Sequence, residues 1–363
     1  MIEERKFGRT IAGEDIVLYS LKNKNGMQAD VMNFGAILVN LFVPDKNGEV
    51  KDVVLGYDRA KDYFVNGSCF GSTIGPVANR TAKGQFELDG TIYNLIINDN
   101  DNNLHSDGNA GLHKTMWQAE KKETENAVTF SVSCKDGLLG FPGNRKFAVT
   151  YKLTEDNALE IHYFASTDKD TLVNMTNHSY FNLNTQGSDA MRHFLEIESE
   201  EYMPVDRDGI PTGEICDVCE VMDFSEPKRI LTGLKSEKIN EDLINRHGYD
   251  HNYVIKHDAF NIAKAAVLTS VESGRRMTLY ANTPGLQFYS GNFLEEPRTA
   301  ICLEPQYFPD ALHHSDDFYW NPQPILEAGL LTKFEARYEF SVISPEETDT
   351  LTDLDDILDD LQL

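Results

Sequence analysis

The chain of 363 residues is poor in positive charge. Only 33 lysines and arginines stand against 59 aspartates and glutamates, which gives a formal net charge of −26. Nucleic-acid binding needs a basic surface that neutralises phosphates, so we expect no nucleic acid partner. A phosphorylated substrate is also disfavoured, although a local arginine cluster could override the overall field. The expected ligand is therefore a neutral small molecule.

Long apolar runs and a dense cysteine pattern are missing as well. No apolar run approaches the roughly 18–20 residues that span a bilayer, and residues 1–7 lack the apolar core of a signal peptide. Five cysteines cannot all pair, and Cys216 and Cys219 have CxxC spacing without a second pair or a βαβ context. These absences predict a cytoplasmic protein with reduced thiols and no membrane contact.

Helical periodicity is scarce, whereas alternating strands and turns are frequent. Residues Phe86–Leu95 contain Asp-Gly between two alternating stretches, which predicts a hairpin. Only Ser236–Asn245, followed by Gly248, has the pattern of an internal helix. Further strands are expected at Ile37–Val43, Val53–Leu55, Ala127–Cys134, Lys146–Leu153, Leu159–Ala165, Phe194–Ile197, Arg276–Ala281, Phe288–Phe293, Ala300–Leu303 and Ala336–Ile343. This order predicts an all-β fold, a large antiparallel β-sandwich with few short helices.

The last residues differ from the rest of the chain. No repeat or linker divides residues 1–345, which we expect to form a single domain, and residues 346–363 form an acidic tail. Leucines recur in it at steps of three and four, at Leu351, Leu354, Leu358 and Leu361. This spacing predicts an amphipathic helix that docks on the domain or on a second subunit, which leaves a monomer and a homodimer both open; the alternative is a disordered end.

The segment Thr176–Leu183, Thr-Asn-His-Ser-Tyr-Phe-Asn-Leu, is the most informative stretch. It places His178 among β-branched, aromatic and amide side chains, as at the polar end of a buried strand. An imidazole titrates near neutral pH, so a pocket-facing His178 can exchange protons. The alternative is a core histidine whose hydrogen bonds are satisfied by its neighbours.

Polar clusters of the same kind recur far along the chain. Asn79 and Arg80 follow a loop rich in glycine and proline, His105 lies in a loop before Trp117, and Asp250 begins an aromatic strand. Arg80 could simply pair with a surface acid, and His105 could be solvated. Glu304 ends an apolar strand broken by Pro305, where burial would raise its pKa and suit it to act as a general base, or where it could be a structural carboxylate.

Together these segments resemble the aldose 1-epimerase (galactose mutarotase) family. The matching motifs are Asn33–Ala36, Asn79–Leu95, Asn103-Leu104-His105, Thr176–Leu183, Tyr249–Asn252, Thr283-Pro284-Gly285 with Gln287 and Tyr289, and Glu304-Pro305-Gln306, in the family's order. The resemblance implies a β-sandwich that interconverts the α and β anomers of free aldohexoses such as galactose and glucose, without metal or organic cofactor.

The resemblance also implies roles for single residues. Glu304 would be the catalytic base and His178 the acid. The sugar would be lined by Arg80, Asn79, His105, Asp250, Gln287 and Phe288. One departure concerns the loop around His105: the family usually has Leu-His-Gly-Gly followed by Gly-Phe, whereas this chain has Leu104–Gly108 as Leu-His-Ser-Asp-Gly and then Gly111-Leu112.

Three other functions fit parts of the same pattern. His105, His178 and Glu304 could form a two-histidine, one-carboxylate metal site. A non-catalytic carbohydrate-binding protein would use the same polar cup. A hexose-6-phosphate 1-epimerase would share the architecture but needs a basic phosphate pocket, and the sequence has no compact arginine cluster at the proposed site.

Overall fold

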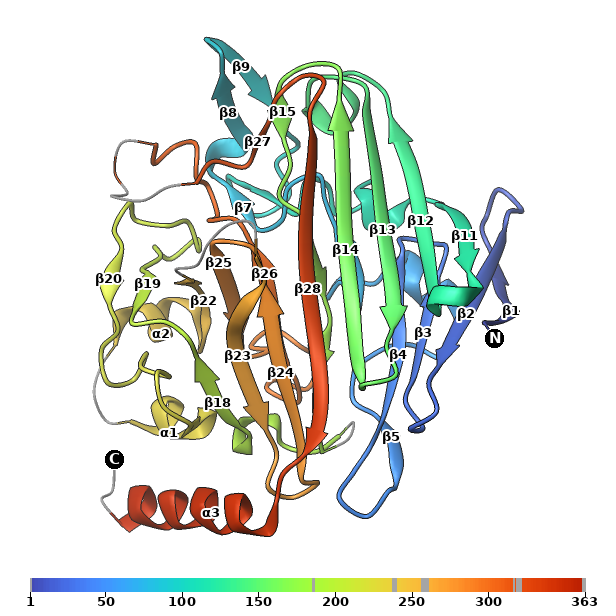
Figure 1. Ribbon diagram of the computed structural model, residues 1–363. Helices are drawn as coiled ribbons and strands as arrows, with labels where there is room; N and C mark the ends of the chain where they lie inside the picture. The colour runs from blue at the N-terminus through green and yellow to red at the C-terminus, as the bar shows by residue number, and fades with distance from the viewer. Residues whose placement is uncertain are drawn as a thin grey trace.

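The computed structural model describes residues 2–184, 187–236, 240–255, 261–315, 317 and 322–360, with side chains described as far as Asp353. The largest element is a nine-stranded antiparallel sheet, whose long strands run through the middle of Figure 1. In spatial order its strands are β11 (Gln118–Lys122), β12 (Ala127–Cys134), β13 (Arg145–Leu153), β14 (Ala158–Thr167), β28 (Leu331–Val342), β24 (Arg275–Ala281), β23 (Ala263–Thr269), β18 (Phe194–Ile197) and β21 (Lys228–Arg229).

Two further sheets are antiparallel too. The N-terminal sheet contains β1 (Glu3–Arg9), β2 (Asp15–Lys22), β3 (Gln28–Met32), β4 (Ile37–Pro44) and β5 (Val50–Asp52). The six-stranded sheet has the order β17 (Tyr180–Phe181), β26 (Ile301–Gln306), β25 (Gly285–Tyr289), β22 (Asp250–Val254), β19 (Glu201–Met203) and β20 (Cys216–Asp217). Figure 1 shows these two sheets beside and behind the nine-stranded sheet.

Short elements connect the sheets. The two-stranded pairs are β16 (Thr176–His178) with β6 (Ser72–Ile74), β10 (Asn103–Leu104) with β7 (Arg80–Thr81), β8 (Gln85–Leu88) with β9 (Thr91–Asn94), and β15 (Thr171–Leu172) with β27 (Ile325–Leu326). The 3-10 helices are η1 (Ala60–Phe64), η2 (Ala82–Gly84), η3 (Leu112–Lys114), η4 (Glu123–Glu125), η5 (Leu138–Gly140) and η6 (Ala190–Arg192). The α-helices are α1 (Ile230–Lys235), α2 (Glu241–Arg246) and α3 (Pro345–Asp360).

One hydrophobic core joins the three sheets. Strands β13, β14 and β28 alternate between buried and partly exposed residues, so each turns one face inward. The inward face meets side chains of the other two sheets in a continuous cluster that includes Val31, Tyr151, Phe181, Phe288 and Tyr338. The predicted all-β antiparallel sandwich with few helices is therefore confirmed, and so is the hairpin, whose strands β8 and β9 pair across Asp89 and Gly90.

The predicted helix Ser236–Asn245 is only partly correct. Ser236 follows α1 and lies outside a helix, residues 237–239 lie outside the described residues, and α2 begins at Glu241. The Asn240 side chain accepts a hydrogen bond from the Leu243 amide (3.0 Å) and so caps α2 at that point. The helix ends at Arg246, and the residue after it, His247, has a left-handed φ of 56°.

The acidic tail begins as a helix that lies on the domain. Helix α3 crosses beneath the lower end of the sheet in Figure 1, Leu351 packs with Phe194 and Ile343, and Arg276 Nη1 lies 2.6 Å from Glu347 Oε1. The side chains of Leu354 and Leu358 and the whole of Leu361 lie outside the described residues. The domain boundary at residue 345 stays a prediction. No helix in the described ranges is both long and apolar enough to cross a membrane.

Candidate active site

A pocket of about 180 Å³ lies where β22, β25 and β26 meet residues of β7, β10, β16 and β17. Seven of the eight predicted site residues line it: Asn79, Arg80, His105, His178, Asp250, Gln287 and Glu304. Lining residues that the sequence analysis did not assign to the site include Tyr180, Tyr289, Phe293 and the loop Gly67–Cys69. The structure therefore brings together seven predicted side chains, of which Asn79 and Glu304 are 225 positions apart in the chain.

Strand register explains which side chains face the pocket. Asp250 pairs with Tyr289 and Tyr289 with Cys302, while Gln287 pairs with Glu304 one pleat further along. Paired residues on neighbouring strands point to the same side of a sheet, so these side chains share the pocket face.

The predicted role of Phe288 in binding the sugar must be corrected, because this residue does not line the pocket. It lies between Gln287 and Tyr289 on β25 and therefore points to the opposite face. There it is fully buried, and its ring stacks on Tyr249 with 4.8 Å between centroids. Tyr289 takes the place in the pocket wall that the resemblance implied for Phe288. The alternation from Gln287 was the signal that would have selected Tyr289.

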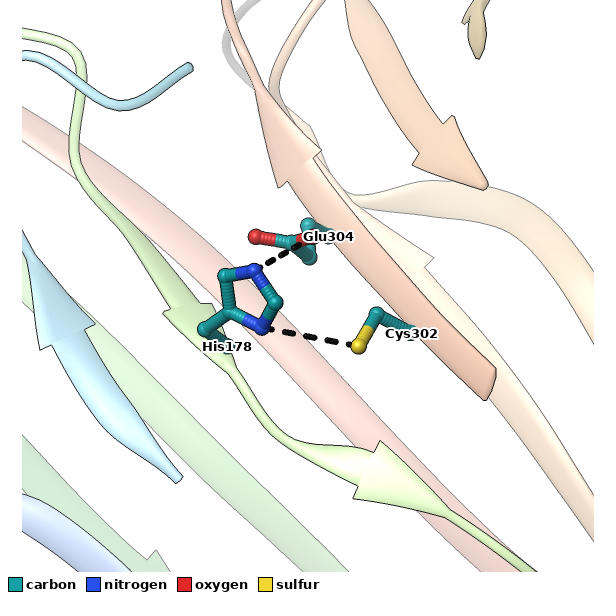
Figure 2. Close-up of side chains that lie close together, drawn as sticks. All are labelled: His178, Cys302 and Glu304. Atoms are coloured by element: carbon teal, nitrogen blue, oxygen red, sulfur yellow. Dashed lines mark hydrogen bonds and ion pairs between the residues drawn. The ribbon is translucent and has the colours of Figure 1, made fainter. Parts of the chain in front are cut away.

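His178 and Glu304 face each other inside the pocket. His178 ends β16, Glu304 lies in β26, and His178 Nε2 is 3.7 Å from Glu304 Oε1 (Figure 2). The other ring nitrogen of His178, Nδ1, lies 3.5 Å from the thiol of Cys302. The ring also stacks on Tyr180, with 5.0 Å between centroids. Glu304 Oε2 is buried and has no hydrogen-bond partner among the described residues, so it is available to a ligand hydroxyl.

Burial moves the pKa of each of these two groups toward its neutral form. It lowers the pKa of His178 to about 4. It raises the pKa of Glu304 well above its usual range, and the negative charge of Asp250 acts in the same direction. Both shifts therefore oppose the ion-pair form of the two groups and favour the form in which His178 is neutral and Glu304 protonated.

His105 is held as a neutral hydrogen-bond donor. The backbone amide of Asn79 donates to His105 Nδ1 (3.1 Å), so the ring hydrogen is on Nε2. Burial lowers the pKa of His105 well below its usual range, and the nearby charges of His178, His113 and Arg80 add to this effect.

The loop that departs from the family pattern is tied to the strand segment beside it. Ser106 has a φ of 66° and is fully buried. Its hydroxyl accepts a hydrogen bond from the Val77 amide (2.9 Å) and donates one to the Val77 carbonyl (2.8 Å). These bonds hold the loop against the segment that carries Asn79 and Arg80.

Asp250 is the centre of a charged network. Arg246 Nη2 donates to Asp250 Oδ2 (2.8 Å), Gln287 Nε2 donates to Asp250 Oδ1 (2.9 Å), and Arg80 Nη1 lies 3.7 Å away. Arg80 also donates to Asp99 Oδ2 (2.8 Å). Burial alone would raise the pKa of Asp250, but Arg80 and Arg246 outweigh it, so the pKa is lowered and Asp250 stays ionised.

One group of possible metal ligands lies in the described part of the chain. An imidazole nitrogen of His178, the Cys302 sulfur and a Glu304 oxygen lie within 4.8 Å of one another. However, Nε2 faces Glu304 while Nδ1 faces Cys302 (Figure 2), and an ion binds only one nitrogen of a ring. An ion on either ring nitrogen therefore has its nearest second ligand on that side only, and His105 is not part of the cluster. We assign no metal to the site, and a reaction without cofactor stays a prediction.

Comparisons with known proteins agree with this geometry. A family model described as aldose 1-epimerase matches residues 17–339. The galactose mutarotase of Sus scrofa is 36% identical over 320 residues, which cover 85% of this chain and 90% of the relative. The aldose 1-epimerase of Escherichia coli (strain K12) is 35% identical over 323 residues, which cover 86% and 91%.

Solved structures agree as well. The galactose 1-epimerase from Lactobacillus acidophilus NCFM has a TM-score of 0.82 and 26% identity, with 95% of this chain and 99% of that chain covered. An aldose epimerase homologue from C. elegans has a TM-score of 0.81 and 30% identity, with 90% and 99% covered. The family resemblance noted in the sequence is confirmed, and the chain belongs to the aldose 1-epimerase family of isomerases.

Proposed function

We propose that the protein interconverts the α and β anomers of a free aldohexose of the galactose or glucose type, with Glu304 as the base and His178 as the acid. The observation that carries this proposal is the pair itself: a carboxylate oxygen and an imidazole nitrogen 3.7 Å apart, facing a pocket of polar side chains. A free monosaccharide is then the partner, and no cofactor takes part in the steps below.

The reaction needs two proton transfers. The ionised carboxylate of Glu304 takes the proton of the anomeric hydroxyl, the bond between C1 and the ring oxygen breaks, and the imidazolium of His178 protonates that oxygen. The C1–C2 bond of the open aldehyde rotates, and the same transfers run backwards to close the ring on the other face. Each positioned group contributes on the order of 10²–10⁴ in rate.

The pKa directions fit this cycle. Ring opening leaves Glu304 protonated and His178 neutral. Burial favours these same neutral forms of the two side chains. The ionic form, in which Glu304 is a carboxylate and His178 an imidazolium, has the same number of protons and is the form that starts ring opening. The proton arrangement that burial favours is thus the one that ring opening produces.

Hydroxyl recognition falls to the other polar groups. Asp250 is ionised and accepts hydrogen bonds, whereas His105 Nε2 and the Arg80 guanidinium donate them. These groups hold the sugar with C1 beside Glu304 and the ring oxygen beside His178, which is the positioning that the proton transfers require.

A phosphorylated substrate is not favoured by the charges of this pocket. Arg80 and Arg246 do meet at Asp250, a cluster that was not visible in the sequence. Both guanidiniums are balanced by carboxylates, because Arg246 pairs with Asp250 and Arg80 with Asp99 and Asp250. Among the described lining residues Arg80 is the one lysine or arginine, which leaves no surplus cation for a phosphate.

The test is polarimetry on freshly dissolved α-D-galactose with Glu304→Gln and His178→Asn. Each variant should remain folded and lose anomer equilibration to the uncatalysed background. Glu120→Gln, an exposed carboxylate on β11, is the matched control and should keep the wild-type rate. A near-normal rate in either site variant refutes its assigned role, and wild-type binding without mutarotation would leave a carbohydrate-binding protein instead.

The compartment and the oligomeric state belong to the proposal as well. We propose a cytoplasmic protein with reduced thiols, and the five cysteines are unpaired in the structure. Both a monomer and a homodimer are compatible with α3 docked on its own domain.

A further inference from the structure

An aromatic ring at the pocket has no part in the mechanism above. Phe293 lines the pocket, yet 57% of its surface is exposed. It is the one phenylalanine in the described ranges that is exposed rather than buried or half-buried. A large exposed apolar ring beside a polar pocket indicates a surface that a ligand covers.

The ring is held in a fixed position. The Phe293 amide donates to the Tyr289 hydroxyl (2.8 Å), and the two rings are nearly parallel, at 20° with 6.4 Å between centroids. The Arg246 guanidinium lies 5.6 Å from the Phe293 centroid. Asn292 anchors the turn before it, since its side-chain amide donates to the carbonyls of Arg246 and Tyr249 (both 2.9 Å). Binding of a ligand over the ring therefore costs little side-chain conformational entropy, because Phe293 is already ordered.

The polar side chains of the pocket match the hydroxyls and the reacting atoms of a sugar, but not its C–H groups. Hydroxyls are served by Arg80, Asp250 and Gln287, and the reacting atoms by His178 and Glu304. A pyranose also carries C–H groups, and on part of each ring face they form an apolar surface. Covering that surface removes apolar area from water, and a flat aromatic ring matches its shape.

We propose that Phe293 is a substrate-binding residue whose ring covers the C–H face of the bound pyranose at the pocket mouth. This inference rests on the proposed function and adds to it a platform for the closed ring, continuous with Tyr289. Because the platform touches both anomers in the same way, it contributes binding that is equal in the ground and transition states.

The test separates KM from kcat. In Phe293→Ala, initial mutarotation rates of α-D-galactose should show KM raised about tenfold with kcat within twofold, which is the signature of lost uniform binding. Phe293→Tyr keeps the aromatic face, and its KM should stay within threefold of wild type. Phe293→Leu, which is apolar but not flat, should lie between the two. Ile244→Ala is the control, since Ile244 is 59% exposed on α2 and lies outside the pocket.

Two results would overturn the proposal. An unchanged KM in Phe293→Ala would show that the ring does not touch the sugar. A joint fall of kcat and of the melting temperature would show that the ring only supports Tyr289 and Arg246.

A binding measurement tests the Phe293 platform independently of the catalytic roles proposed for Glu304 and His178. Calorimetric titration of D-galactose into Glu304→Gln and into the double variant with Phe293→Ala should show about tenfold weaker binding in the double variant. That difference stands even if Glu304 proves not to be the base, and equal affinities would refute the platform alone.

Discussion

At the scale of single residues, the pKa values of His178 and Glu304 set the pH range in which the two side chains together carry one proton. Burial lowers the pKa of His178 to about 4, so the imidazole becomes protonated, and the pair gains a second proton, only near that pH. Burial raises the pKa of Glu304, so the pair keeps its single proton to higher pH than a free carboxyl would. The one-proton form, which the proposed cycle requires, therefore spans the range between these limits.

This predicts an unusual pH profile. After subtraction of the uncatalysed rate, kcat/KM for galactose should fall on the acid side with an apparent pKa near 4. Polarimetry across pH 3.5–9 measures it, in buffers whose own catalysis has been subtracted. An acid limb at about pH 6.5, the ordinary value of histidine, would contradict a buried His178.

Ser106 shows how a departure from the family pattern is compensated by one hydroxyl. Replacing it by alanine leaves the buried Val77 amide and carbonyl without the partner they have now, at a cost of about 1–3 kcal/mol. A Cβ also remains at a φ of 66°. Ser106→Ala should therefore unfold at lower urea concentration than wild type. Ser106→Gly removes the backbone strain and should lose less, so equal midpoints for alanine and wild type would contradict this account.

At the scale of elements, the pocket depends on strand register more than on any single motif. The polar segments could be predicted because each places polar side chains next to an apolar run, as Glu304 follows Ile301–Leu303. The prediction that Pro305 breaks this strand is wrong, because β26 continues to Gln306 and Pro305 pairs with Leu286. The assembly of the polar segments could not be predicted, because the pairing of Gln287 with Glu304 and of Asp250 with Tyr289 joins segments far apart in the chain.

The same limit explains the residues that were missed. Arg246 reaches Asp250 because α2 ends at Arg246, the next residue, His247, has a left-handed φ, and the chain then enters β22. Cys302 reaches His178 only because β17 pairs with β26. By contrast, the choice of Tyr289 over Phe288 follows from strand alternation alone and was available from the sequence.

Helix α3 offers a prediction about an element that is separate from the site. Leu351 is 7% exposed and packs on Phe194 and Ile343, so Leu351→Asp places a charge in an apolar contact and should lower stability by about 1–3 kcal/mol. Mutarotation at 25 °C should be unchanged, because α3 does not line the pocket. Thr352→Asp, at the exposed neighbouring position, is the matched control for added charge. Equal melting temperatures for the two variants would mean that α3 does not dock through Leu351.

At the scale of the whole molecule, the net charge of −26 surrounds a pocket whose own arginines are balanced by carboxylates. Such a field repels anions and leaves neutral sugars unaffected, and salt screens it over a distance of about 10 Å at 0.1 M. We therefore expect electrostatics at this scale to disfavour phosphorylated sugars without any contact to the phosphate.

Ionic strength should separate the two kinds of substrate. The kcat/KM for α-D-galactose should change less than twofold between 10 mM and 500 mM NaCl, because a neutral sugar gains nothing from the field. Galactose 6-phosphate should be equilibrated at least tenfold more slowly at 10 mM NaCl, and added salt should recover only part of that loss. The remainder reflects the missing phosphate partner inside the pocket, where Arg80 is already paired with Asp99 and Asp250. Faster turnover of the phosphorylated sugar at low salt would instead require that Arg80 or Arg246 leaves its carboxylate for the phosphate, and would favour the hexose-6-phosphate alternative.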